Sequence, residues 1–116
     1  MPMSRFFRIN TVKNFAINND PVKLSLHLNL RSLVSFELDT GSHISTLCER
    51  DAMKCGASIQ ATADRALAYG GASINLIGEC KIPVKLGSFQ TNHKFLVVNN
   101  REVNLLSKDL CNAMNI

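Results

Sequence analysis

Apolar and polar residues alternate along the chain from residue 24 onward. Every second position between residues 24 and 30 is a leucine, with polar residues between them, and residues 34–38 repeat this alternation. A period of two predicts β-strands with one buried and one exposed face. With residues 31–32 as the turn, the two stretches predict a β-hairpin whose second strand ends at Asp39.

Shorter patterns predict the remaining elements. We expect strands at residues 44–47, 82–86 and 95–98, a hairpin over 67–77, helical turns over 48–56, and a helix over 107–114. Gly56 suits a helix C-cap, and Gly87–Ser88 suits a turn between strands. Six or seven short strands with one terminal helix predict a closed or sandwich-like all-β domain.

The length and composition indicate one folded domain. The chain has 116 residues, of which 46% are hydrophobic and 19% charged, which suits a single modest core and excludes a disordered segment. Residues 1–20 are polar and rich in asparagine, show no periodicity, and end at Asp20–Pro21. We therefore predict an N-terminal arm or linker over residues 1–20 and one domain over residues 21–116.

No stretch of the sequence has the pattern of a membrane or export segment. The longest uncharged stretch, residues 66–78, is interrupted by glycines and polar residues, whereas a membrane-spanning helix needs about 18 or more consecutive apolar residues. The first twenty residues lack the apolar core and cleavage site of a secretory signal. We expect a cytoplasmic protein that makes no membrane contact.

Cysteines and histidines are scattered singly along the chain. They are Cys48, Cys55, Cys80, Cys111, His27, His43 and His93. Zinc sites use closely spaced ligand pairs, and small disulfide frameworks belong to secreted chains, so we expect no metal and four free thiols in the core. Glycine-rich phosphate loops and a nucleophile elbow are also missing. We therefore expect no cofactor.

The basic character of the chain is modest. Thirteen Lys and Arg against nine Asp and Glu give a net charge of +4. The basic residues are dispersed, and only 6% of residues are aromatic, so no stacking surface for nucleic acid is predicted. We prefer a solvated basic surface, and keep an RNA-associated structural segment as a third interpretation of the charge.

The sequence from Asp39 to Ser42 carries the clearest chemical signal. A strand that ends in a carboxylate and enters a glycine-containing turn is what a catalytic aspartate needs, because the strand fixes the carboxylate and the turn exposes it. Apolar residues on both sides predict partial burial, where a carboxylate is costly without a partner. An ordinary Asx turn after a strand is the alternative interpretation.

The longer string around this aspartate resembles the active-site segment of retropepsin-type aspartic proteases. It reads VSFELDTGSHISTL over residues 34–47. Further stretches resemble, in order, the short turn, flap, strand pair, closing strand and pre-helix signature of retrotransposon proteases. These are residues 48–56, 67–79, 82–87, 95–98 and 104–110. The resemblance covers about residues 21–114 and is closest to gypsy-type LTR retrotransposon proteases.

This resemblance implies a closed retropepsin-like β-barrel with one short C-terminal helix. The chain holds one Asp-Thr-Gly motif, so a second aspartate has to come from a symmetric copy, which implies a homodimer with both Asp39 residues on its two-fold axis. The two carboxylates would share a proton and activate a water. Thr40 would brace the dimer by a hydrogen bond between copies, and Gly41 would allow close backbone approach.

The resemblance also implies a substrate site. Tyr69, Gly70, Gly71 and Ala72 would form the flap, whose backbone pairs with an extended polypeptide by strand addition. Ser42 would hydrogen-bond the outer oxygen of Asp39 beside the substrate. From the residues alone, Tyr69 is equally well interpreted as a surface aromatic. We expect Asp51, Asp64 and Asp109 to be solvated or ion-paired rather than catalytic.

Two positions depart from the family pattern, with Ser107 in place of Gly and Lys108 in place of Arg. Ser suits a helix N-cap, but a position that required positive φ would be strained by it. The first functional hypothesis is an aspartic endopeptidase that processes its own retroelement polyprotein in the cytoplasm or within virus-like particles. The alternative is a domesticated, inactive retropepsin-like module for dimerisation or peptide binding.

Overall fold

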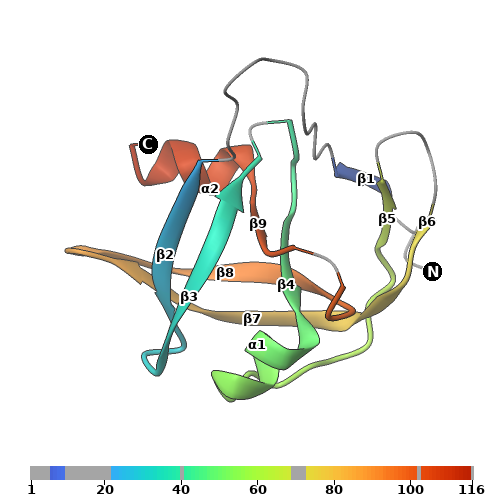
Figure 1. The fold of residues 1–116 in the computed structure, drawn as a ribbon, viewed down its shortest axis with the longest axis horizontal. Helices are drawn as coiled ribbons and strands as arrows, with labels where there is room; N and C mark the ends of the chain where they lie inside the picture. The colour runs from blue at the N-terminus through green and yellow to red at the C-terminus, as the bar shows by residue number, and fades with distance from the viewer. Residues whose placement is uncertain (1–5, 10–21, 40, 69–72, 102, 116) are drawn as a thin grey trace.

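The computed structural model describes residues 6–9, 22–39, 41–68, 73–101 and 103–115. The strands in these ranges are β1 (Phe6–Ile9), β2 (Lys23–Leu28), β3 (Ser32–Leu38), β4 (Ser45–Cys48), β5 (Arg65–Ala68), β6 (Ser73–Ile74), β7 (Leu76–Leu86), β8 (Phe89–Val98) and β9 (Leu105–Leu106). The helices are α1 (Glu49–Lys54) and α2 (Lys108–Ala113). Six strands form a closed barrel in the order β2-β3-β9-β4-β8-β7, which confirms the predicted closed all-β class (Figure 1).

The first hairpin, β2–β3, forms as the alternation predicts. Leu26 lies opposite Val34 and Leu24 opposite Phe36, so the hairpin places one apolar face toward the core. The predicted turn at residues 31–32 lies slightly too late in the chain, because Ser32 already belongs to β3. Asn29 and Leu30 make the turn with φ of 56° and 55°, and this left-handed pair matches the twist of a tight hairpin.

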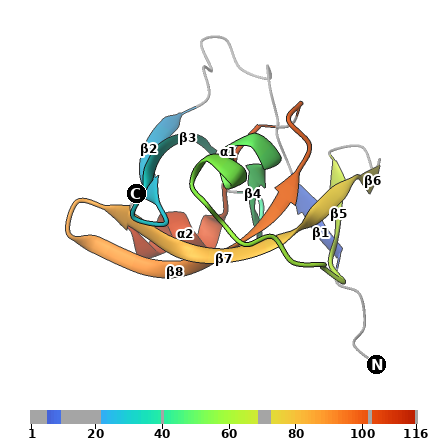
Figure 2. The same cartoon turned by 90° about the horizontal axis from the view of Figure 1, so that it is seen from below.

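The second hairpin, β7–β8, is longer than the sequence predicts. Its strands pair from Leu86↔Phe89 at the turn back to Leu76↔Val98, with Gly87–Ser88 as the predicted turn between them. The prediction stopped at residues 82–86 and 95–98 because the outer parts of both strands carry many polar side chains. Figure 2 shows this long hairpin curving along one side of the barrel, of which both strands are part.

The core lies inside the barrel and is centred on two aromatic rings. Phe36 of β3 and Phe95 of β8 stack with their ring centroids 5.7 Å apart. All four residues of β4 are buried. A second apolar cluster, made of Ile44, Ala66, Leu96 and Leu105 with their neighbours, lies where the β5–β6 hairpin meets the barrel.

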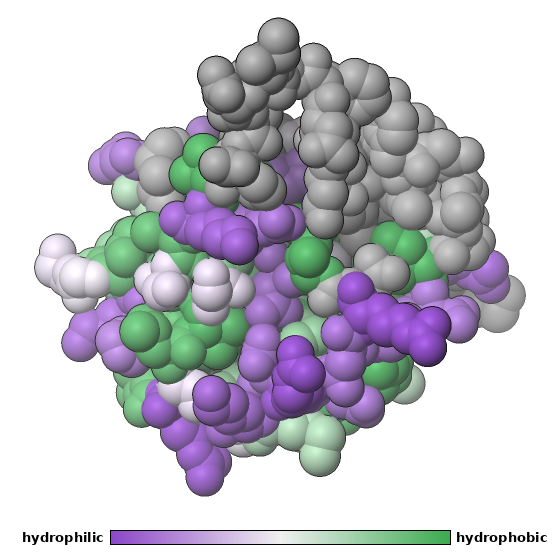
Figure 3. All heavy atoms as spheres, in the orientation of Figure 1, coloured by the Kyte–Doolittle hydropathy of each residue, from purple (hydrophilic) through white to green (hydrophobic). Residues whose placement is uncertain are grey.

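Surface and termini add two observations. Apolar surface lies over the β2–β3 hairpin among polar side chains (Figure 3), where Leu33 is 58% exposed.

Within the first twenty residues, for which the sequence predicted no strand, β1 forms and pairs with β5 in parallel. The division into an arm and a domain stays a prediction. In the described part of the chain, the helices are all too short or too polar to cross a membrane.

The four cysteines are free and buried, as predicted. Burial raises the pKa of every one of these thiols, and that of Cys80 to about 12. Since the thiolate is the reactive form, we expect a thiol reagent at pH 8 to label the folded protein at least about tenfold more slowly than the protein unfolded in guanidinium. Stopped-flow absorbance measures both rates. A cysteine that reacts in the folded protein as fast as in the unfolded protein would contradict this prediction.

Candidate active site

The site is built around Asp39 at the end of β3. Strand β3 pairs in parallel with β9, with Leu38 opposite Leu106. The backbone N–H of Asp39 continues this ladder by donating to the Leu106 carbonyl at 3.0 Å. The residue is 6% exposed. The two strands therefore fix the backbone position of a carboxylate that is almost buried.

A tight turn orients this carboxylate. The N–H of Gly41 donates to Asp39 Oδ1 at 3.1 Å, and the N–H of Ser42 donates to the Asp39 carbonyl at 3.1 Å. This is the geometry of an Asx turn, so the turn predicted as the ordinary alternative does form. Because it buries and aims the carboxylate, the Asx turn is compatible with a catalytic role.

Ser42 closes the turn. Its side chain is fully buried, its Oγ donates to the Ile44 carbonyl at 2.8 Å, and the same Oγ accepts from the Ile44 N–H at 3.3 Å. In this geometry the hydroxyl proton goes to Ile44, so the residue holds the shape of the turn. Its contact with Asp39 or with substrate stays a prediction.

Helix α2 supports the turn from the other side. The N–H of Lys108 donates to the Ser42 carbonyl at 2.9 Å, while the Lys108 side chain is exposed. Ser107 is the helix N-cap, with φ of −68°, and its Oγ accepts from the Leu110 N–H at 3.3 Å. Ser107 therefore causes no strain here, and the difference from the family's glycine is accommodated by capping.

A polar network of Ser45, His93 and Ser107 lies near the Asp39 turn and was not predicted from the sequence. Ser45 Oγ accepts from the Ser107 N–H at 2.9 Å and lies 2.8 Å from His93 Nε2. His93 also meets the ring of Phe95 edge-on, with centroids 5.1 Å apart. These residues are separated by up to 62 positions in the sequence, and a single histidine among polar residues of β8 gave no signal of its partner.

Asn104 was missed as well. Its Oδ1 accepts from the Cys48 N–H at 2.8 Å, and its Nδ2 donates to Asp51 Oδ2 at 2.7 Å and to the Ser35 carbonyl at 3.2 Å. The amide thus links β3, β4 and α1 just before β9. Asp51 accepts a hydrogen bond from Asn104, and Asp109 is exposed on α2. That neither is catalytic stays a prediction.

The hairpin predicted over residues 67–77 forms in part, and its role as a flap stays a prediction. Strands β5 and β6 pair antiparallel, with Ala66 opposite Ile74 and Leu67 opposite Ser73. The tip residues Tyr69, Gly70, Gly71 and Ala72 lie outside the described residues, as does Thr40. Their predicted roles stay predictions. Among the residues that the structure describes, no cluster of His, Cys, Asp and Glu has the arrangement of a metal site.

Comparison with known proteins establishes the fold. No protein-family model matches the chain, and no curated protein matches it. Solved structures do. The EIAV protease in complex with the inhibitor HBY-793 superposes with a TM-score of 0.72 at 15% identity, over 90% of this chain and 95% of that one. The retroviral protease-like domain of Ddi1 from Leishmania major gives 0.62 at 19% identity, over 84% and 80%. The chain therefore has the retropepsin fold.

His93 gives the network a measurable pH dependence. Burial lowers the pKa of its imidazole, although Asp109 acts weakly in the opposite direction. Below about pH 6.5 the unfolded chain takes up a proton that the folded chain resists, so stability falls as the pH decreases. We expect a loss of about 0.5–1 kcal/mol between pH 7 and 5.5 that His93→Gln removes, which is less than the full linkage value because the ring is partly exposed.

Urea unfolding at the two pH values measures this difference. His27→Gln, at an exposed histidine on β2, is the matched control and should keep the wild-type pH dependence. Equal pH dependence in wild type and His93→Gln would show that His93 stays solvated.

Proposed function

We propose that this chain is one subunit of a homodimeric aspartic endopeptidase. The observation that carries the proposal is the nearly buried Asp39 carboxylate, aimed by the Gly41 N–H at the end of β3 within a fold shared with a retroviral protease. Removing a carboxylate from water is costly, so a nearly buried one at the end of β3 in this fold supports a catalytic role. A carboxylate held in this way is ready to exchange protons with a substrate.

The chemistry requires two such carboxylates. One has to remove a proton from water while the other hydrogen-bonds the scissile carbonyl, and the two exchange roles when the leaving amine is protonated. The chain contains one Asp-Thr-Gly, so the second Asp39 comes from a symmetric copy. In this dimer both Asp39 residues lie on the two-fold axis, Thr40 braces the pair by a hydrogen bond between copies, and Gly41 permits close backbone approach.

The substrate in this proposal is an extended polypeptide. The β5–β6 hairpin, with its tip at residues 69–72, covers the peptide and pairs with its backbone by strand addition. We infer that the peptide belongs to the polyprotein of a gypsy-type retroelement, processed in the cytoplasm or within virus-like particles. This inference rests on the sequence resemblance over residues 34–47 and 104–110.

An inactive, domesticated module is the alternative. Part of its motive was the expectation that Ser107 would strain the support beneath the aspartate. The capping geometry of Ser107 removes that reason, so the endopeptidase is the better supported function.

The first test removes the acid and base function and preserves the shape. Asp39→Asn should lower the cleavage rate by about 10²–10⁴-fold or more, because the amide cannot exchange a proton with water or substrate. Digestion of a mixed peptide library between about pH 4 and 7 measures the rate. Asp109→Asn, the same change on the exposed surface of α2, should cleave like wild type. Cleavage that survives in Asp39→Asn would remove Asp39 from the catalytic role.

The second test asks whether each chain supplies half of the site. Wild-type activity should rise more steeply than linearly with protein concentration below the dissociation constant of the dimer. Excess Asp39→Asn chains should lower the activity of wild type, because the mixed dimers contain one carboxylate. Activity that is linear in concentration for a monomer verified by sedimentation, and unaffected by the mutant chains, would contradict the dimer.

A further inference from the structure

Residues 60–64 lead into the β5–β6 hairpin and are called the hairpin root. The hairpin root contacts the barrel at two points. Gln60 and Glu79 exchange backbone hydrogen bonds of 2.8 Å in both directions. Beside them, a Cβ added at Gly78 would lie 2.3 Å from the Gln60 carbonyl oxygen. The chain therefore lies directly on β7 at Gln60, and a side chain at position 78 would force it away.

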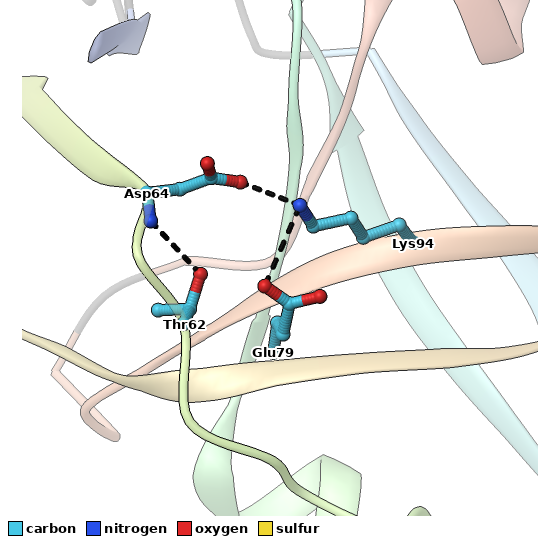
Figure 4. Close-up of polar contacts among 4 residues, drawn as sticks. All are labelled: Thr62, Asp64, Glu79 and Lys94. Atoms are coloured by element: carbon cyan, nitrogen blue, oxygen red, sulfur yellow. Dashed lines mark hydrogen bonds and ion pairs between the residues drawn. The ribbon is translucent and has the colours of Figure 1, made fainter. Parts of the chain in front are cut away.

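The second tie is an ion cluster next to the first residue of β5. Lys94 Nζ lies 2.5 Å from Asp64 Oδ2 and 3.5 Å from Glu79 Oε1 (Figure 4). Lys94 comes from β8 and Glu79 from β7, whereas Asp64 immediately precedes Arg65, where β5 begins. One ammonium group thus joins the start of the hairpin to the two longest strands of the barrel.

Asp64 depends on this ammonium group more than Glu79 does. The side chain of Asp64 is 6% exposed, compared with 29% for Glu79. Loss of a cationic partner costs a buried carboxylate more than an exposed one. Without Lys94, Asp64 loses the contact that joins it to β8, so the hairpin root is freer to move away from that strand.

Such a movement would reach the aspartate turn. Two residues after Asp64, Ala66 of β5 is 1% exposed and packs in one apolar cluster with Ile44, which closes that turn. The angle at which β5 leaves the barrel is therefore coupled to the residues beside Asp39.

We propose that Lys94 is a positioning residue, whose ammonium group holds Asp64 and thereby fixes where β5 leaves the barrel beside the Asp39 turn. This proposal rests on the proposed function where it concerns substrate, but its structural part stands without it. The contacts of the Lys94 ammonium group are with Asp64 and Glu79, outside the Asp39 turn. Lys94 acts through Asp64 on the backbone of β5, so it governs how well an extended peptide is held more than how fast the bond is cleaved.

The deciding experiment is hydrogen exchange on the full chain. Lys94→Met keeps most of the apolar stem and removes the charge, and we expect the amides of β5 and β6 to exchange at least about tenfold faster, with the amides of β7 and β8 unchanged. Lys94→Arg keeps the charge and should restore most of the protection. Lys81→Met is the matched control, since Lys81 is exposed and lies directly opposite Lys94 in the β7–β8 pair.

Two exchange results for Lys94→Met would overturn the proposal. Unchanged exchange in β5 and β6 would show that Lys94 does not hold the hairpin, and a uniform increase over the whole barrel would show that it only stabilises the fold. Glu79→Gln should change the exchange by less than Asp64→Asn, because Glu79 is farther from the ammonium and more exposed. If Glu79→Gln and Asp64→Asn changed the exchange equally, Asp64 would not be the main residue through which Lys94 holds the hairpin.

Steady-state kinetics measure how Lys94 affects the binding of substrate. For Lys94→Met we expect KM to rise several-fold with kcat within about twofold of wild type, which is the signature of lost substrate positioning. An equal fall in kcat and kcat/KM would contradict a positioning role. If wild type cleaves no peptide, the proposed function fails, while the exchange experiment still decides whether Lys94 anchors the hairpin.

Discussion

The burial of a single carboxylate is the constraint around which this small barrel is arranged. Asp39 is 6% exposed at the end of β3, so each backbone group near it needs a partner that water no longer supplies. β9 supplies the Leu106 carbonyl, and α2 supplies the Lys108 N–H to the Ser42 carbonyl. Both elements are short, and both come from the last twelve residues of the chain. β9 and α2 thus both hold the aspartate turn, in addition to packing Leu106, Leu110 and Cys111 into the core.

Local patterns predicted the elements whose formation depends on local residues. The alternation around Leu26 and Val34 located the first hairpin, and Gly87–Ser88 located the turn of the second. Strand lengths were underestimated, because residues 76–80 of β7 and 89–93 of β8 are held by pairing with the predicted segments 95–98 and 82–86 rather than by a strong local apolar pattern. The first turn was predicted at residues 31–32 instead of at Asn29 and Leu30, because a leucine with positive φ gives no sequence signal.

The candidate site divides in the same way. Asp39 and its turn were predictable, since the carboxylate, glycine and flanking apolar residues are consecutive. The supporting contacts were not, because His93, Asn104 and Lys94 find partners 30 to 69 positions away. Such pairs follow from the closure of the barrel, which no short window contains. Ser107 shows the opposite case, where a departure from the expected pattern has a local explanation in helix capping.

The position of β1 bears on the strand addition proposed for a peptide at β5. A strand has two edges, and those of β5 are taken by β6 on one side and β1 on the other, with β1 on the barrel side (Figures 1 and 2). Under that proposal, a peptide that pairs with β5 on the barrel side would replace residues 6–9, in an exchange of one strand for another. Its apparent affinity would then be the intrinsic affinity multiplied by the fraction of chains in which β1 has left β5. The peptide and β1 would compete for one edge of the same strand.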